Sequence, residues 1–600
     1  MPSSTVTPPA RAVEAATVTE ALRRTAASHP DGPALRTVDD GVSLTWSQVL
    51  ERAEAIAGGL AGLGVCRGDA VAIMLSNRIE FHLVDLAAAM LGATPFSIYT
   101  TYPPEEIRYL IEDAGARVAV VERDFLEAMQ EARRALPGLQ HVIIVDGDST
   151  ADTVSLSHVE GSLPDFDVAG AAAAVSADDI LTLIYTSGTT GRPKGVELTH
   201  GNVMAGAAAV EQIISLDPGS RVISWLPAAH IAERMAHHYI PLIYAGTVTI
   251  CPNPREIVSF LPQVRPTWFF AVPRIWEKLK SGLETMQAAA PEEQRQRAEQ
   301  ALSAATQRVR LRQRGEPVPE ALEAAVAQAD AAMFAPLRAM LGLDQVRAVN
   351  VGAAPTPIEV LEFFHALGIE VAELWGMSET CGCGLCNRPG EVRIGAVGPP
   401  SPGAEVKLAG DGELLVRGAF VMPRYRHQPE KTAETLDRDG WLHTGDIAEI
   451  DEDGFVRIVD RKKELIINAA GKNMSPANIE ATIKTSSPLI GQACCIGDAR
   501  PYNTALILLD ADFAPVWAQQ QGIEDAGLAG LAEHPRVREA VQAAIDEANR
   551  HLARVEQIKK FALVGEDWLP GGDELTPTMK LKRRPIAEKY ASRIEAMYAS

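Results

Sequence analysis

Residues 185–197 combine glycines, hydroxyl side chains and cations in a pattern suited to binding a polyphosphate. They read Tyr-Thr-Ser-Gly-Thr-Thr-Gly-Arg-Pro-Lys-Gly-Val-Glu and follow residues 180–184, an apolar run short enough to be a buried strand. Glycines let backbone N–H groups approach an anion, the hydroxyls add donors, and Lys194 adds a point charge. The stretch is not a Gly-x4-Gly-Lys-Ser/Thr loop, because Arg192 and Pro193 follow Gly191. The expected phosphate ligands are Thr186, Ser187, Gly188, Thr189, Thr190, Gly191 and Lys194.

A flexible surface turn is the alternative interpretation of this stretch, but the restrictive string at residues 186–195, Thr-Ser-Gly-Thr-Thr-Gly-x-Pro-Lys-Gly, disfavours it. The string resembles the phosphate loop of the adenylate-forming superfamily, which includes acyl-CoA synthetases, luciferases and the adenylation domains of peptide synthetases. Further motifs occur in order from about residue 45 to residue 584, so the resemblance covers nearly the whole chain. It implies ATP as a substrate and an α/β fold, in which a large N-terminal domain of stacked sheets and helices carries a small mobile α/β C-terminal domain.

Joining a carboxylate to ATP requires nearby cations and N–H donors, because both reactants are anionic. Mg2+ prefers hard oxygen ligands and retains several waters, so one carboxylate and one hydroxyl are enough to hold it. Residues 375–380, Trp-Gly-Met-Ser-Glu-Thr, resemble the family's aromatic-Gly-x-Ser/Thr-Glu motif. By this resemblance Glu379 and Thr186 share the Mg2+ ion. Trp375 stacks on adenine and Ser378 contacts a nucleotide phosphate, whereas an isolated Trp-Gly pair would indicate core packing. The nucleotide-binding residues implied by the motif are Trp375, Gly376, Met377 and Ser378.

Two further segments resemble the family's adenine- and ribose-binding motifs. Residues 350–355, Asn-Val-Gly-Ala-Ala-Pro, offer small side chains that a flat base can approach closely. The residues carried over from this segment are Gly352, Ala353 and Ala354. Residues 440–446 end in Asp446, whose carboxylate can accept hydrogen bonds from both ribose hydroxyls. Arg461, in the string Asp-Arg-Lys-Lys, would hold the same ribose from across the interdomain hinge.

A basic run near the end of the chain, at residues 580–584, resembles the family's terminal motif. A solvated tail is the less specific interpretation. By the resemblance, Lys580 reaches the α-phosphate and the acyl carboxylate, with Lys582 as the competing assignment. Lysine suits this role as a compact cation that neutralises developing negative charge. A mobile domain would bring the lysine in for adenylation and withdraw it for thioester formation. We expect the hinge pivot at Lys463, with Asp460 as the alternative.

His230 lies in the string Trp-Leu-Pro-Ala-Ala-His-Ile-Ala-Glu-Arg, where the family has a histidine at the mouth of the acyl pocket. A satisfied core histidine is an equally good interpretation. Some long-chain synthetases carry a gating tryptophan four residues later, but this chain has Arg234, so the gate cannot be assumed. The catalytic residues expected overall are Lys580, Thr186, Glu379 and His230.

The length of 600 residues exceeds what one core usually supports, so at least two domains are expected. Apolar runs alternate with helical patterns, which indicates α/β layers. The predicted organisation has four parts: a disordered lead-in at residues 1–16, an N-terminal AMP-binding and acyl-binding domain at 17–459, a helical insertion within it at about 277–342, and a mobile C-terminal domain at 460–600. A solvated helical hairpin is the preferred interpretation of the insertion.

Composition narrows the class of protein. A formal net charge of −22 argues against nucleic acid as a partner, since neutralising phosphates needs a basic surface. Neither a signal peptide nor a run of 18 apolar residues is found, so we expect a cytoplasmic protein, with peripheral membrane contact left open. Seven cysteines without a signal peptide indicate reduced thiols. Cys381, Cys383 and Cys386 invite a metal interpretation, but no second ligand pair accompanies them. The alternative is that they line the route to the thioester site.

These motifs favour a long-chain fatty-acid–CoA ligase, because the helical insertion resembles the long-chain branch of the acyl-CoA synthetases. Such an enzyme joins a fatty acid to AMP, releases pyrophosphate, and then transfers the acyl group to coenzyme A. Two alternatives remain open: an acyl-AMP ligase that loads a carrier protein, and a non-catalytic nucleotide or lipid sensor on the same scaffold. The insertion disfavours a luciferase. Acyl chain length and oligomeric state do not follow from these residues.

Overall fold

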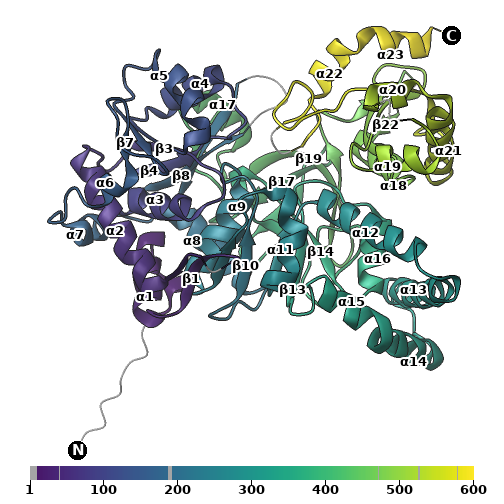
Figure 1. The fold of residues 1–600 in the computed structure, drawn as a ribbon, viewed down its shortest axis with the longest axis horizontal. Helices are drawn as coiled ribbons and strands as arrows, with labels where there is room; N and C mark the ends of the chain where they lie inside the picture. Colours follow the sequence, from purple (N-terminus) through teal and green to yellow (C-terminus); the bar gives the residue numbers. More distant parts are fainter. Residues whose placement is uncertain are drawn as a thin grey trace, which may run out of the picture.

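The computed structural model describes residues 10–39, 41–186, 192–469, 472–524, 527–576 and 579–599. Helices and strands alternate along the chain and build a large N-terminal part, on which a smaller C-terminal part sits (Figure 1). The predicted α/β class, with a large domain and a small α/β C-terminal domain, is confirmed. Among all the residues that the structure describes, no helix is long and apolar enough to cross a membrane.

An eight-stranded sheet forms one half of the N-terminal part, in the order β18-β9-β8-β4-β3-β5-β6-β7. Strands β8 and β4 to β7 run parallel to β3, and β9 and β18 extend the sheet in antiparallel fashion. Helices on both faces bury the parallel strands, which explains their continuous apolar sequences. The strands are β3 (Ala70–Met74), β4 (Thr94–Ser97), β5 (Val118–Val121), β6 (His141–Ile144), β7 (Val154–Ser155), β8 (Ile180–Thr186), β9 (Lys194–Thr199) and β18 (Arg424–Tyr425). The helices are α2 (Trp46–Gly62), α3 (Ile79–Met90), α4 (Pro104–Ala114), α5 (Leu126–Arg133), α6 (Leu156–Glu160), α7 (Val168–Ala173) and α8 (His200–Glu211).

Two four-stranded sheets complete the core of the N-terminal part, in the orders β10-β11-β1-β2 and β12-β13-β14-β15. Their strands are β1 (Pro33–Thr37), β2 (Ser43–Thr45), β10 (Arg221–Ser224), β11 (Thr247–Ile250), β12 (Trp268–Ala271), β13 (Ala348–Val351), β14 (Val371–Gly376) and β15 (Gly384–Cys386). The helices beside them are α1 (Val18–Ser28), α9 (Ile231–Arg234), the π-helical turn η3 (Met235–Tyr239), α10 (Ile240–Ile243), α11 (Ile257–Val264) and α16 (Ile358–Ala366).

A four-stranded antiparallel sheet, β16-β17-β19-β20, leads to the C-terminal part. Its elements are β16 (Glu405–Leu408), β17 (Glu413–Arg417), α17 (Pro429–Thr435), β19 (Leu442–Ile450) and β20 (Val456–Arg461). Because β20 continues to Arg461, the predicted domain boundary at about residue 460 falls near the end of this strand.

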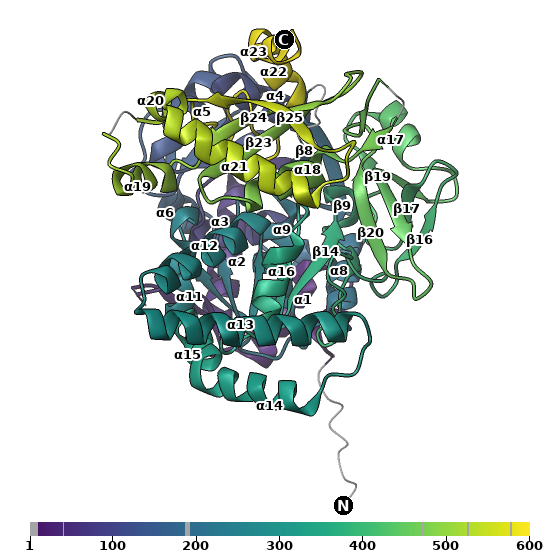
Figure 2. The same ribbon diagram turned by 90° about the vertical axis from the view of Figure 1, so that its right-hand side faces the viewer.

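The segment at residues 277–342 is helical. It comprises most of α12 (Pro273–Ala288), then α13 (Glu292–Gln313), α14 (Glu320–Ala329), the π-helical turn η5 (Asp330–Phe334) and α15 (Ala335–Met340). Figure 2 shows α13 and α14 side by side at the edge of the molecule remote from the C-terminal part. Only Ala305 and Val309 of α13 are buried, and Arg310 of this helix pairs with Glu362 of α16. The hairpin is therefore largely a solvated surface feature.

The C-terminal part has its own apolar core, drawn entirely from residues beyond 465. Its three-stranded sheet has the order β23-β24-β25, and β21 pairs with β22. The elements are β21 (Ile466–Ile467), β22 (Asn473–Met474), α18 (Pro476–Thr485), β23 (Ile490–Ile496), β24 (Asn503–Leu509), α19 (Phe513–Gln520), α20 (Gly527–Glu533), α21 (Pro535–His551), β25 (Ile558–Val564), α22 (Arg583–Lys589) and α23 (Ala591–Tyr598).

The beginning of the chain differs from the disordered lead-in predicted for residues 1–16. Residues 1–9 lie outside the described residues, but Ala12–Glu14 forms a 3-10 turn (η1). This turn packs against α1 and α8. Prolines, serines and alanines suggested disorder there, whereas tertiary contacts order the segment from about residue 10.

Candidate active site

The ends of the predicted phosphate loop are fixed by a hairpin between β8 and β9. Thr186, the last residue of β8, pairs with Lys194, the first residue of β9. The five predicted ligands between them, Ser187 to Gly191, lie outside the described residues. Lys194 Nζ lies 4.3 Å from the centroid of the Tyr425 ring. Burial lowers the pKa of Lys194, the Glu379 carboxylate opposes this shift, and the neighbouring cations Lys431 and Lys463 add to it. Such crowding of cations favours an anionic ligand here.

Glu379 lies in a short 3-10 turn, η6 (Ser378–Thr380), immediately after β14. The residue is buried, and its Oε1 accepts a hydrogen bond of 2.7 Å from the hydroxyl of Tyr425. Within the described ranges its other oxygen, Oε2, receives no hydrogen bond. Tyr425 therefore contacts Lys194 with its ring and Glu379 with its hydroxyl. Sequence reasoning missed this tyrosine, because only the pairing of β18 with β9 brings it to the site.

The rest of the Trp375–Thr380 motif holds the same turn in place. Ser378 is buried, and the backbone N–H of Met377 donates to Thr380 Oγ1 at 3.1 Å. A Cβ on Gly376 would lie 2.1 Å from the carbonyl oxygen of Gly382, so no larger residue fits there. Backbone packing thus explains the glycine of this motif.

Asp446 accepts a hydrogen bond from one predicted nucleotide-binding residue and forms an ion pair with another. The indole N–H of Trp375 donates to Asp446 Oδ2 at 2.8 Å, and Arg461 Nε lies 3.0 Å from Asp446 Oδ1. Asp446 and Arg461 are paired across β19 and β20. Burial raises the pKa of Asp446, while the Arg461 guanidinium acts in the opposite direction. The arrangement fixes a buried carboxylate beside a half-exposed indole, as expected of a ribose and adenine subsite.

The predicted adenine-flanking residues follow β13. Ala353 has φ +71°, a left-handed conformation that is uncommon for a residue with a side chain, and both Ala353 and Ala354 are exposed. Gly352 is buried, and a Cβ on it would lie 2.9 Å from Leu374 Cδ1. Its small size therefore serves the packing of β13 on β14. Close approach of a base to Ala353 and Ala354 stays a prediction.

His230 caps the helix that begins with α9. Its Nδ1 accepts a hydrogen bond from the backbone N–H of Ala232 at 3.2 Å, so in the neutral ring the proton is on Nε2. Burial lowers the pKa of His230 to about 4, and the positive charge of Lys580 contributes to this shift. The side chain is therefore a neutral N–H donor at physiological pH.

Lys580 lies in the C-terminal part, in the loop that precedes α22. Its backbone N–H donates to Thr576 Oγ1 at 3.0 Å. Lys580 is an exposed residue. Neighbouring protein atoms and the Arg461 charge lower the pKa of its ammonium, and Asp446 and Glu379 oppose this shift. The competing candidate, Lys582, donates to the carbonyl oxygen of Gly572 at 2.8 Å and so serves its own loop.

The two candidate pivot residues have different surroundings. Asp460 is buried, and its carboxylate accepts a hydrogen bond of 2.5 Å from Ser475 at the start of α18. Lys463 is exposed and lies in the turn between β20 and β21. Rotation at Lys463 would break fewer interactions than rotation at Asp460.

Arg234, at the position where a gate was considered, is completely buried. It pairs with Asp85 of α3, donates to the Tyr239 hydroxyl at 3.0 Å, and donates to Ser97 Oγ at 3.0 Å. Its Nε donates to the carbonyl oxygen of Ala228 at 3.1 Å, close to His230. Arg234 therefore ties the loop carrying His230 to α3 and β4.

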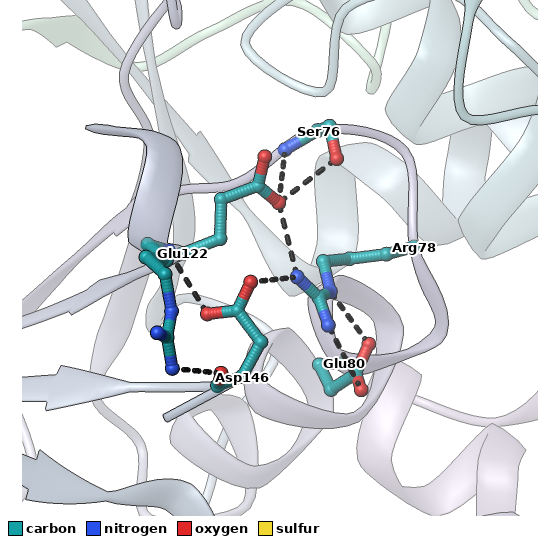
Figure 3. Close-up of polar contacts among 6 residues, drawn as sticks. Ser76, Arg78, Glu80, Glu122 and Asp146 are labelled. Carbon is teal, nitrogen blue, oxygen red and sulfur yellow. Dashed lines mark hydrogen bonds and ion pairs between the residues drawn. The ribbon is translucent and has the colours of Figure 1, made fainter. Parts of the chain in front are cut away.

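A second polar cluster occupies the carboxyl ends of β3, β5 and β6 (Figure 3). Arg78 lies at its centre, with its Nε 2.8 Å from Glu80 and its Nη1 3.2 Å from Glu122 and 3.4 Å from Asp146. Ser76 Oγ donates to Glu122 at 2.8 Å. Three carboxylates surround this guanidinium, so the cluster joins three loops of the sheet edge and does not attract a polyphosphate.

The cysteines that follow Glu379 are buried free thiols. Burial raises the pKa of Cys383 and of Cys386 to about 12, so neither is a thiolate at neutral pH. Cys383 Sγ would lie 3.1 Å from a Cβ on Gly206 of α8, so the sulfur fills space against that helix. Wherever the structure describes the chain, no group of three or more His, Cys, Asp or Glu residues could hold a metal ion.

Comparison with known proteins places these motifs in a family. The model of the AMP-binding enzyme matches residues 22–426, and that of the AMP-binding enzyme C-terminal domain matches residues 463–600. The chain belongs to the AMP-binding enzyme family. This confirms the resemblance seen in the phosphate loop and the motifs that follow it.

Three proteins illustrate the relatives of this AMP-binding enzyme. It is 50% identical over 436 residues, 72% of this chain and 76% of the relative, to fadD11 of Mycobacterium tuberculosis, which carries the provisional name fatty-acid–CoA ligase. It is 35% identical to the long-chain-fatty-acid–CoA ligase FadD15 of Mycobacterium bovis, over 95% of both chains. The crystal structure of the anthranilate CoA ligase AuaEII in complex with anthranoyl-AMP has the same fold, with a TM-score of 0.73 and 22% identity, covering 97% of this chain and 98% of that one.

Proposed function

We propose that this AMP-binding enzyme is a long-chain fatty-acid–CoA ligase. It converts a fatty acid, ATP and coenzyme A into acyl-CoA, AMP and pyrophosphate through an acyl-AMP intermediate. The observation that carries the proposal is the buried Asp446 carboxylate, which accepts the Trp375 indole N–H at 2.8 Å and pairs with Arg461 at 3.0 Å. Lys580, from the C-terminal part, adds a cation whose charge acts on Asp446, Arg461 and His230. The family and the names of the relatives agree with this reaction.

In the first step a carboxylate oxygen of the fatty acid attacks the α-phosphorus of ATP, and pyrophosphate leaves. Asp446 accepts the ribose hydroxyls, with Arg461 beside it, and the Trp375 ring stacks on adenine. Lys194 and the N–H groups of the 187–191 loop neutralise the departing phosphates. Lys580 reduces the repulsion between carboxylate and α-phosphate, because a cation placed where charge develops lowers the barrier.

Mg2+ is the metal that this site would take. Glu379 offers a buried carboxylate with one oxygen held by Tyr425, and Thr186 at the end of β8 offers a hydroxyl. Hard oxygen donors of this kind suit Mg2+, which keeps waters in its remaining positions. When bound, the ion neutralises phosphate charge. Tyr425 orients the carboxylate by donating its hydroxyl to Glu379 Oε1.

His230 contributes a hydrogen bond rather than proton transfer. Its neutral Nε2–H can donate to the carboxylate or carbonyl oxygen of the acyl group, since Nδ1 is already occupied by Ala232. Arg234 keeps this orientation by holding Ala228.

In the second step the thiol of coenzyme A attacks the acyl carbonyl carbon and expels AMP. Lys580 is not needed for this step, because it serves the domain orientation used for adenylation and is withdrawn with the mobile C-terminal domain. The C-terminal domain, predicted at residues 460–600, turns about Lys463 to clear the route for the thiol. Lys463→Pro fixes φ near −65° and should block one half-reaction while sparing the other. Equal loss in both half-reactions would count against Lys463 as the pivot.

The substrate class is tested by acyl-CoA formation across acids from acetate to C20 and aryl acids. An apolar tunnel binds fatty chains at roughly 0.8 kcal/mol per buried methylene, so kcat/KM should rise with chain length until the tunnel is filled. A parallel assay replaces coenzyme A with a phosphopantetheinylated carrier protein. Acyl transfer to the carrier but not to coenzyme A would overturn the proposal.

A further inference from the structure

One face of α12 contacts the C-terminal part through charged side chains. Arg274, Glu277 and Lys278 are spaced by three and four residues and so share that face. Both ribbon views place the helix next to α18 and α19 (Figures 1 and 2). Arg274 Nη1 donates to the carbonyl oxygen of Gly491 at 3.0 Å, and its Nη2 donates to Asp510 Oδ2 at 2.9 Å. One guanidinium thus reaches two loops of the C-terminal part.

The acceptor for Arg274 is held in position before it is bound. Asp510 Oδ1 accepts the backbone N–H groups of Asp512 and Phe513, at 3.1 and 2.9 Å, where α19 begins. A Cβ on Gly491 would lie 2.8 Å from the Cα of Asp510, so glycine allows the two acceptor loops to lie together. The Asp510 side chain is 17% exposed and loses little freedom on pairing.

A second pair on the same face has the opposite polarity. Lys484 Nζ, at the end of α18, lies 3.7 Å from Glu277 Oε1, and the side chains are 24% and 17% exposed. Here the anion belongs to α12 and the cation to the C-terminal part, whereas the Arg274 pair has the reverse arrangement. Because the two pairs have opposite charge arrangements, sliding α12 along the C-terminal part would bring like charges together. The pairs therefore disfavour other relative positions of the two parts. The third contact, Lys278 with Asp512 at 3.5 Å, is largely exposed and contributes little.

A further interdomain contact lies in the chain that leads to Lys580. A Cβ on Gly571 would lie 2.7 Å from Thr101 Oγ1, in the loop that follows β4. The C-terminal part therefore touches the N-terminal part closely at this loop as well as at α12.

We propose that Arg274 and Glu277 of α12 are positioning residues for adenylation. Their ion pairs with Asp510 and Lys484 hold the C-terminal domain in the orientation that presents Lys580. The inference rests on the proposed two-step function. These ion pairs must break when the domain turns, so they favour the first half-reaction over the second. Neither residue touches the nucleotide-binding groups described above; each acts through the domain it holds.

The test is a charge exchange across the second pair. Glu277→Lys should slow single-turnover acyl-AMP formation by about two- to fivefold, the size expected for a partly exposed pair turned repulsive. Thioester formation from supplied acyl-AMP should be unchanged or faster. Glu277→Lys combined with Lys484→Glu should restore adenylation to near the wild-type rate. Glu284→Lys is the matched control, because Glu284 lies on the same helix and pairs with Lys280 within it.

Equal slowing of both half-reactions, or no recovery in the double variant, would overturn the proposed positioning role of Arg274 and Glu277. If Glu277→Lys fails to fold, Arg274→Gln gives the same comparison of half-reactions, since it removes the charge while keeping a polar side chain. Unchanged adenylation in Arg274→Gln would also overturn the proposal. A wild-type enzyme that forms no acyl-AMP would refute the proposed function itself and is recognised before any variant is compared.

Discussion

Arg461 Nε lies 3.0 Å from Asp446 Oδ1 across the β19–β20 ladder. The aspartate is 3% exposed and its other oxygen accepts the Trp375 N–H, so the carboxylate is oriented before any nucleotide arrives. Preorganised charge of this kind binds a ligand without paying to reorganise the site.

Asp446→Asn should therefore weaken nucleotide binding. A neutral amide cannot accept two ribose hydroxyls as a carboxylate can, and a hydrogen bond to a charged group contributes about 1.5–3 kcal/mol, or roughly ten- to a hundredfold in affinity. Calorimetric AMP titration measures the change. Glu449→Gln, an exposed change on the same strand, is the control. Affinity of Asp446→Asn equal to that of the control would remove Asp446 from the ribose site.

Glu379→Gln should raise the Mg2+ concentration needed for half-maximal adenylation, because an amide oxygen is a poorer ligand for a hard cation. Tyr425→Phe should give a milder change in the same direction, since it frees the carboxylate without removing it. Rates measured against Mg2+ at fixed ATP check both. Wild-type Mg2+ dependence in Glu379→Gln would show that the metal is held elsewhere.

Lys580→Ala should abolish acyl-AMP formation and largely spare thioester formation from supplied acyl-AMP. Lys582→Ala is the matched comparison, because the Lys582 ammonium donates to the carbonyl oxygen of Gly572 within its own loop. The two half-reactions are timed separately by rapid quench. Normal adenylation in Lys580→Ala together with its loss in Lys582→Ala would move the catalytic assignment by two residues.

The pH dependence of kcat/KM for the fatty acid should show no titration by His230 near neutrality. Its pKa of about 4 leaves the ring neutral above about pH 5, so His230→Gln should lower the rate without changing the shape of the profile between pH 5.5 and 8. An alkaline limb should appear below the ordinary lysine pKa of about 10.4, because the pKa of Lys580 is lowered and its proton is lost earlier. A wild-type limb near pH 6.5 that disappears in His230→Gln would contradict the neutral-donor role.

Much of this fold follows from local pattern. The apolar run at residues 70–75 corresponds to β3, and the helical periodicity at 46–63 corresponds to α2, which Thr45 caps by accepting the Gln48 N–H. These elements were predictable because burial on both faces and an N-cap leave clear local signals. Among the motif residues, the structure joins Trp375, Asp446 and Arg461 by direct contacts, whereas the roles assigned from the family resemblance stay predictions.

What could not be predicted depends on contacts between distant segments. Tyr425 reaches Glu379 only because β18 adds to the edge of the β8–β9 hairpin. Arg234 is buried because α3 supplies Asp85, and no local pattern reveals that pair. Glu277 and Lys484 are far apart in the sequence, so their ion pair becomes visible only once the relative positions of the two domains are known.

The most direct test of the two-step account follows the oxygen atoms of the fatty acid. Palmitate labelled with 18O at both carboxylate positions is incubated with the enzyme, ATP, Mg2+ and coenzyme A, and the products are weighed by mass spectrometry. Attack of the carboxylate on the α-phosphorus, followed by expulsion of AMP by the thiol, should transfer one labelled oxygen to AMP and leave pyrophosphate unlabelled. Unlabelled AMP, or label appearing in inorganic phosphate alongside ADP, would contradict the acyl-AMP intermediate and with it the proposed function.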